Sequence, residues 1–285
     1  MTEVSIPPLV DPYWLSARLW DPKIIVLDAT FPLSEAENTG ITFRASHIPG
    51  ARWLDFRRLS RKLHPVPRQI PSVAQVARAM SALGIHREMH AVIYDQHGLN
   101  MGASRAWWLF HLFGHDRVSV LDGGLTAWLT ANLPIESGAV AEAVPLSQME
   151  KLPTPRKSTL LRTRRQVAAA LNHDTAAVID LRPRPNFLGD APELLPNLPA
   201  GHIPGSSNLP FSDLLDGASA RLLPVDRLRA RLSAAGALDQ PVIATCGIGV
   251  VACTLSLALA VLGKAPAPVY DGSWADWAPS VGTGA

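Results

Sequence analysis

The chain has 285 residues, of which 47% are hydrophobic and 18% are charged, and its formal net charge is +2. This length fits two domains, each long enough to bury a core. The small net charge excludes a surface dominated by polyanion binding, so no nucleic-acid partner is expected. Two cysteines, Cys246 and Cys253, are too few for a disulfide framework and are expected to be free thiols.

No segment of the sequence predicts targeting to a membrane. Residues 1–5 lack a basic stretch followed by an apolar one, so no signal peptide is expected. The longest nearly apolar run, Val250 to Leu262, is shorter than the roughly 20 residues that a membrane span needs. A cytoplasmic protein without a membrane partner is therefore expected.

Short β-branched runs alternate with helical stretches along the chain. In chain order, the runs and helices are expected at 26–28, 73–83, 92–95, 103–113, 178–180, 225–234, 242–245 and 251–262. The runs are apolar on both faces, as buried parallel strands are. Together they predict an α/β fold whose mainly parallel sheets have helices on both faces. The proline-rich stretch 141–158 is expected to link an N-terminal domain, 1–140, to a C-terminal domain, 159–285.

The sequence repeats itself once, weakly but in order. The segment Ser46-His47-Ile48-Pro49-Gly50 matches Gly201-His202-Ile203-Pro204-Gly205, and similar matches pair 91–95 with 242–246 and 120–124 with 269–273. The spacings between these segments differ only by loop-sized amounts. Two copies of one domain explain the pattern, and in this register Asp95 stands where the second copy has Cys246.

Cys246 follows the expected strand 242–245 and opens a glycine-bearing loop before an apolar helix. In open α/β sheets, ligands bind at the carboxyl ends of strands. Gly247 and Gly249 let backbone N–H groups point inward, and these donors together with the helix dipole favour a negative charge. The Cys246 thiol is therefore expected to have a lowered pKa and to act as a nucleophile. Cys253, inside the helix, is expected to be a small buried hydrophobe.

Further segments add to the repeat and to the Cys246 loop, among them Arg105-Ala106-Trp107-Trp108 and Tyr270-Asp271-Gly272-Ser273-Trp274. The ordered set, which runs from Leu9 to Trp277, resembles the tandem-domain rhodaneses, and within them the thiosulfate and 3-mercaptopyruvate sulfurtransferases. The resemblance implies two rhodanese-like domains with Cys246 as a persulfide-forming nucleophile at their interface. It also implies a small anionic sulfur donor and a thiol, a thioredoxin-like protein or cyanide as acceptor.

The chain departs from the pattern of the mercaptopyruvate enzymes. Their Cys-Gly-Ser-Gly-Val-Thr loop carries the serine of a serine–histidine–aspartate relay, and here Ile248 and Val251 replace its serine and threonine. The relay's histidine segment here contains Arg68, and its aspartate aligns with Arg57. The arginine–lysine pair of the thiosulfate enzymes is missing from the loop as well.

Family arginines of the second domain are also replaced, one by Asn186 and another by Leu195. Arg182 and Arg184 lie nearby and are expected to compensate, although Arg182 fits a buried ion pair behind its strand equally well. The expected substrate-binding residues are Gly247, Ile248, Gly249, Val250, Val251, Arg182, Arg184, Asn186, Arg57 and Arg68.

Basic residues crowd one segment of the first domain: Arg57, Arg58, Arg61, Lys62 and Arg68. They form either a solvated loop or a positive rim that attracts a divalent anion. Thiosulfate releases sulfite without a proton, whereas mercaptopyruvate releases an enolate or carbanion that a general acid assists. Loss of the relay therefore favours thiosulfate or another anionic sulfur donor.

Two other functions compete with sulfur transfer, and the sequence argues against the first of them. A Cys-x5-Arg phosphatase needs an arginine six residues after its cysteine, where this chain has Ala252. A catalytically weak protein-interaction or sulfur-relay module would explain the lost substrate contacts. His47 and His202 are expected to be structural, and the other histidines lack ligand spacing, so no metal is expected. No phosphate loop or dinucleotide fingerprint is present, so no cofactor is expected either.

Overall fold

The computed structural model of the protein describes residues 6–34, 37–60, 66–67, 69–138, 157–193, 195 and 197–280. The chain forms two compact units. The first consists of 1–60, 71–157 and 217–221, and the second of 61–70, 158–216 and 222–285. The expected linker 141–158 lies outside the described residues except for Lys157 and Ser158, so the expected domain boundaries stay predictions.

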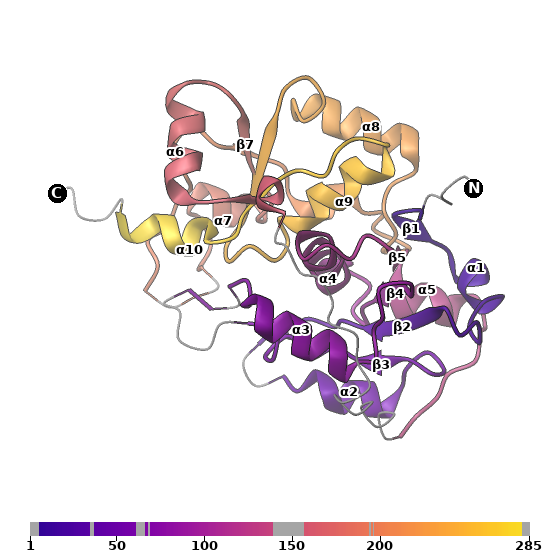
Figure 1. The fold of residues 1–285 in the computed structure, drawn as a ribbon. Coiled ribbons are helices and arrows are strands. Elements are labelled where there is room, and N and C mark those ends of the chain that lie inside the picture. Colours follow the sequence, from indigo (N-terminus) through magenta and orange to yellow (C-terminus); the bar gives the residue numbers. More distant parts are fainter. Residues whose placement is uncertain are drawn as a thin grey trace. The chain divides into compact units, whose positions relative to one another are not determined.

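In its described residues, the first unit is a parallel five-stranded sheet with the helices α1 to α5 (Figure 1). Its elements are β1 (Leu9–Val10), α1 (Pro12–Ser16), β2 (Ile24–Asp28), α2 (Thr39–Ala45), β3 (Arg52–Trp53), α3 (Val73–Ala82), β4 (His90–Tyr94), α4 (Met101–Leu112), β5 (Val118–Leu121) and α5 (Gly124–Thr130). The strand order is β1-β5-β4-β2-β3, and every neighbouring pair is parallel.

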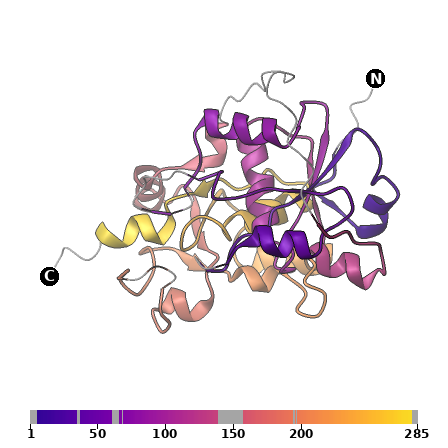
Figure 2. The ribbon, with the colours of Figure 1, turned by 90° about the horizontal axis from the view of Figure 1, so that it is seen from below.

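The second unit repeats this plan, and its elements can be followed from a second direction in Figure 2. They are η2 (Ser158–Leu160), β6 (Leu161–Arg162), α6 (Arg164–Asn172), β7 (Ala177–Asp180), α7 (Arg184–Leu188), β8 (Ser207–Asn208), η3 (Phe211–Leu214), α8 (Val225–Ala234), β9 (Val242–Thr245), α9 (Cys253–Val261), β10 (Val269–Tyr270), α10 (Ser273–Trp277) and η4 (Ala278–Ser280). The strand order β6-β10-β9-β7-β8 is that of the first sheet, strand for strand.

Local sequence explains where helices begin in both units. Asp11 follows β1 and caps α1 by accepting a hydrogen bond from the Trp14 N–H. Thr163 follows β6 in the same way and forms a reciprocal capping box with Gln166 at the start of α6. The same switch from strand to capped helix therefore opens each repeat.

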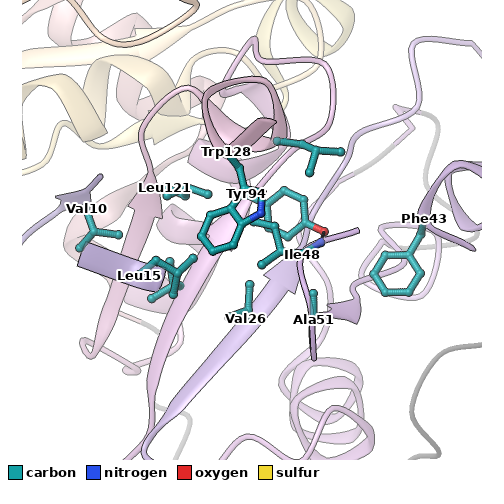
Figure 3. Packing of buried hydrophobic residues seen from close by; sticks show 11 residues of the cluster. Val10, Leu15, Val26, Phe43, Ile48, Ala51, Tyr94, Leu121 and Trp128 are labelled. Carbon is teal, nitrogen blue, oxygen red and sulfur yellow. Dashed lines mark hydrogen bonds between the residues drawn. The ribbon is translucent and has the colours of Figure 1, made fainter. Parts of the chain in front are cut away.

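The central strands β4 and β9 are buried along their whole length, as their apolar sequences predict. In the first unit, strands β2, β4 and β5 supply Val26, Tyr94 and Leu121 to a cluster that Trp128 of α5 closes. Figure 3 shows these side chains gathered around the Tyr94 ring, whose hydroxyl accepts a hydrogen bond from the Ile48 N–H. A matching cluster fills the second unit. The predicted fold class, two α/β units with parallel sheets and helices, is confirmed.

No helix within the described part of the chain combines the length and apolar character needed to cross a membrane.

Candidate active site

Cys246 lies directly after β9, the middle strand of the second sheet. The neighbouring strands β7 and β10 end beside it, at Asp180 and Tyr270. All strands of the sheet are parallel, so their carboxyl ends meet at this edge, where α/β folds bind ligands. The Cys246 residue is only 1% exposed. The sequence therefore placed the thiol correctly at the end of a buried strand.

Backbone N–H groups of the following loop surround the thiol. The Gly249 N–H donates to Cys246 Sγ at 3.1 Å. N–H groups of Ala252 and Ile248 also act on the sulfur and lower its pKa. The loop thus forms the expected cradle of donors, although α9 begins only at Cys253, two residues later than predicted.

Burial raises the pKa of the Cys246 thiol above its ordinary value of 9.0. The negative charge of Asp180 acts in the same direction, and the three N–H groups oppose both effects. The expected lowering of this pKa is therefore wrong, because removing water from the thiolate outweighs the stabilisation that the cradle supplies.

Gly249 requires glycine for both conformation and space. Its φ is +83°, and a Cβ there would lie 2.5 Å from the Asp271 carbonyl oxygen. Asp271 also binds the 69–70 segment, because the Gln69 side chain donates to its carbonyl at 2.9 Å and the Ile70 N–H donates to its carboxylate at 2.8 Å. Asp271 thus connects that segment to the thiol loop. Nothing in the sequence indicates this connection.

Arg182 is buried beside the loop in a network of ion pairs. Its guanidinium contacts the Asp180 carboxylate at 2.8 Å and the Glu193 carboxylate at 2.8 Å, and it donates to the Gly201 carbonyl at 2.8 Å. It also lies over the Trp274 ring, 5.4 Å from the centroid. These contacts correspond to the buried-ion-pair alternative, not to a side chain free to bind substrate.

The other expected substrate-binding residues of the second unit differ in how far they are buried and in what they contact. Ile248 and Val250 are buried, and Val251 is half-buried. Gly247 leaves room for a side chain, since the nearest atom to a Cβ there would be Arg182 Cδ at 3.9 Å. Arg184 is exposed at the start of α7. The Asn186 amide, in the same helix, donates to the Pro192 carbonyl at 2.7 Å.

The expected basic rim is described only in part. Arg57 lies in the first unit, where it pairs with Asp55 at 3.1 Å and lies 5.9 Å from the Trp53 ring centroid. Arg68, Arg61 and Lys62 lie outside the described residues. The expectation that this segment faces the Cys246 loop from across an interface therefore stays a prediction.

The first unit has the same loop with a carboxyl group in place of the thiol. Asp95 follows β4 and is 1% exposed. N–H groups of Ala103 and Gly98 donate to its carboxylate, and burial raises its pKa to about 6. Gly98, at the position of Gly249, also has a positive φ, +67°. The two loops share a backbone plan and differ in the group that they hold.

The two histidines of the repeated motif have equivalent structural contacts. Each donates a hydrogen bond from Nδ1 to the carbonyl of a phenylalanine at 2.8 Å, His47 to Phe43 and His202 to Phe187. Each ring also stacks on that phenylalanine. Within the described ranges, no three His, Cys, Asp or Glu side chains come together as metal ligands.

The sequence analysis missed Ser273 as a neighbour of the thiol. Its hydroxyl accepts a hydrogen bond from the Cys246 N–H at 3.1 Å and lies 3.9 Å from Cys246 Sγ. The signal was present in the repeat, because Ser273 matches a glycine, Gly124, in the first copy.

Comparison with known proteins assigns the family. The rhodanese-like domain family matches residues 11–131 and again residues 163–280. The chain belongs to the rhodanese family. This rhodanese is 35% identical to the 3-mercaptopyruvate sulfurtransferase of Escherichia coli K12, over 93% of its own length and 92% of that protein. It is also 35% identical to the thiosulfate sulfurtransferase of Gallus gallus, over 94% and 92% of the two chains.

Solved structures agree with this assignment. The rhodanese superposes on the crystal structure of SseA from Escherichia coli, reported as a 3-mercaptopyruvate sulfotransferase, with a TM-score of 0.83 and 34% identity. That match covers 94% of this chain and 99% of SseA. Tum1 from Saccharomyces cerevisiae shares the fold, with a TM-score of 0.83 at 24% identity over 97% and 96% of the chains.

Proposed function

We propose that this rhodanese is a sulfurtransferase that carries sulfur as a persulfide on Cys246. The observation that supports this most is a buried thiol held by loop N–H groups at the end of the middle strand β9. The Cys246 thiolate attacks the outer sulfur of a donor, and a sulfur–sulfur bond forms as the donor's bond to that sulfur breaks. An acceptor thiolate or cyanide then removes the sulfur and returns the electron pair to Cys246 Sγ.

We propose thiosulfate as a donor at least as good as 3-mercaptopyruvate. The side chains that the loop offers are apolar, namely those of Ile248, Val250 and Val251. None of them can protonate a carbon leaving group, whereas sulfite leaves as an anion without a proton. Loss of a positioned general acid typically costs about 10²–10⁴-fold. That cost falls on mercaptopyruvate and spares thiosulfate.

Intact mass after incubation with each donor tests the persulfide. The wild type should gain one sulfur atom, Cys246→Ser should gain none, and Cys253→Ser should behave like the wild type. The third protein is the matched control, because it removes the other free thiol. A sulfur on Cys253 in the wild type would overturn the assignment of the nucleophile.

Steady-state kinetics with cyanide, a small thiol and a thioredoxin-like protein as acceptors then tests the donor. The expected result is a kcat/KM for thiosulfate equal to or above that for 3-mercaptopyruvate. A clear preference for 3-mercaptopyruvate would contradict the donor proposal, but it would not contradict the proposal that the protein is a sulfurtransferase.

One observation favours a second candidate, a catalytically weak protein-interaction or sulfur-relay module. The raised pKa of Cys246 keeps the thiol protonated near neutral pH, and a protonated thiol is a poor nucleophile. Such a module would show no donor-dependent persulfide in the mass experiment and no turnover with any acceptor.

A further inference from the structure

A cavity of about 280 Å³ lies beside β3, the outer strand of the first sheet. Successive side chains of a strand point to opposite faces of the sheet. Trp53 accordingly contacts α2, where its indole N–H donates to Thr39 Oγ1 at 3.2 Å. The Arg52 guanidinium donates instead to the Leu83 carbonyl, at the end of α3. The cavity is therefore bordered by β3 and by residues of two helices.

Apolar side chains form much of the cavity wall. Leu54 and Leu59 come from the segment after β3, and Ala79 and Leu83 come from α3 and its C-terminal end. The same four residues line a second void of about 10 Å³, which reaches Phe110 of α4. Burying apolar surface against such a wall is favourable, so the cavity suits a ligand with an apolar body.

Three arginines and one carboxylate complete the polar part of the wall. Arg44 comes from α2, Arg52 from β3, and Arg58 and Asp55 from the segment after β3. Asp55 already pairs with Arg57 at 3.1 Å and with Arg58 at 3.9 Å. Within the described ranges, neither Arg44 nor Arg52 forms an ion pair. The wall therefore carries more positive than negative charge.

Arg52 is the arginine that gains most from an anionic ligand. The residue is half-buried, and a charge that leaves water needs hydrogen bonds or a counter-charge in return. The Leu83 carbonyl accepts from one N–H of a guanidinium that has five. A carboxylate in the cavity could accept two parallel hydrogen bonds from such a group.

We propose that this cavity binds a small organic carboxylate, with its charge on Arg52 and Arg44 and its apolar body against Trp53. The volume lies just below the range of about 300–1,000 Å³ for drug-sized ligands, so a one- or two-ring acid fits and a nucleotide does not. Two basic residues expected at a donor-attracting rim also belong to this region. Arg58 lines the cavity, and Arg57 lies 5.9 Å from the Trp53 ring centroid. The proposal does not depend on the sulfurtransferase activity.

Isothermal titration calorimetry with 2-naphthoate tests the role of charge. The matched probe is 2-naphthamide, which keeps the two rings and lacks the charge. The wild type should bind naphthamide at least about 10-fold more weakly, because charge-assisted hydrogen bonds are the stronger ones. Arg44→Gln and Arg52→Gln should each weaken naphthoate binding by about 10- to 100-fold and leave naphthamide binding unchanged. Arg78→Gln removes an exposed arginine of α3 outside the cavity, so it should bind both probes like the wild type.

A second pair of variants tests the role of space. Ala82 of α3 lines the cavity, so Ala82→Phe should fill it and weaken the binding of both probes. Ala74 is exposed on the same helix and does not line the cavity, so Ala74→Phe is the matched control and should bind like the wild type. Chemical unfolding of each variant shows whether it is folded.

Arg44 is exposed, so Arg44→Gln keeps the charge test decisive even where Arg52→Gln fails to fold. Three results would each overturn the proposal. They are a wild type that binds no naphthoate, equal affinities for naphthoate and naphthamide, and unchanged naphthoate binding in Arg44→Gln or in Ala82→Phe.

Discussion

Replacing Asp95 by asparagine tests how strongly burial controls a charge in the shared loop. The Asp95 carboxyl is buried, and its pKa rises from an ordinary value of 3.8 to about 6. The folded protein therefore holds this proton more tightly than the unfolded chain does. Between about pH 4 and pH 6 the unfolded chain has lost the proton and the folded protein keeps it, so stability falls as pH rises through this window.

The size of the effect follows from the shift. About two pKa units at about 1.4 kcal/mol per unit give about 3 kcal/mol of stability lost between pH 4 and pH 7. Asparagine has no charge to bury, so Asp95→Asn should lack this loss. The free energy of unfolding of the variant, minus that of the wild type, should therefore rise by about 3 kcal/mol between pH 4 and pH 7. Groups common to both proteins, such as His90 and His115, cancel in this difference.

Urea unfolding, followed by tryptophan fluorescence at several pH values, measures this difference in the free energy of unfolding. Six of the eight tryptophans lie in the first unit, which also contains Asp95, so the signal reports mainly that unit. Asp116→Asn is the control of opposite sign, because His111 and Lys157 hold the pKa of Asp116 below its ordinary range. That variant should lose stability near neutral pH and regain parity in acid. A difference between Asp95→Asn and the wild type that stays constant from pH 4 to pH 7 would refute the reasoning.

Two further predictions concern the thiol loop of the second unit. Arg182→Met should lower the free energy of unfolding by about 3–5 kcal/mol, because it leaves Asp180 buried without its counter-charge. A loss below about 1 kcal/mol in chemical denaturation would contradict this. Gly249→Ala should lose at least about 2 kcal/mol, because its φ is positive and its Cβ would collide with Asp271, whereas Gly247→Ala should lose clearly less in the same measurement.

The sequence was sufficient where periodicity or repetition carried the information. The strand 242–245 and the helix 225–234 were predicted with the bounds that the structure has. The repeat predicted that Asp95 and Cys246 occupy equivalent places, and both follow the middle strands of their sheets. Such features depend on neighbours along the chain or on a match between two segments, and both are visible in a linear sequence.

Features that depend on the balance of contacts in space were not predictable in this way. The direction of the Cys246 pKa shift depends on two opposing effects. Burial removes water and raises the pKa, whereas the N–H groups that point at the sulfur lower it. The pairing of Arg182 with Glu193 joins residues whose loop geometry no local pattern specifies. The contact of Gln69 and Ile70 with Asp271 joins segments about 200 residues apart, and only folding brings them together.

In both loops, burial outweighs the backbone N–H groups in setting the pKa of the group that the loop holds. In both repeats N–H groups donate to the buried group, yet burial raises the pKa of the Asp95 carboxyl and of the Cys246 thiol alike. The carboxyl of the first repeat therefore ionises near neutral pH, whereas the thiol of the second repeat stays protonated there, and the repeats differ in chemistry because they differ in the group at the end of the middle strand.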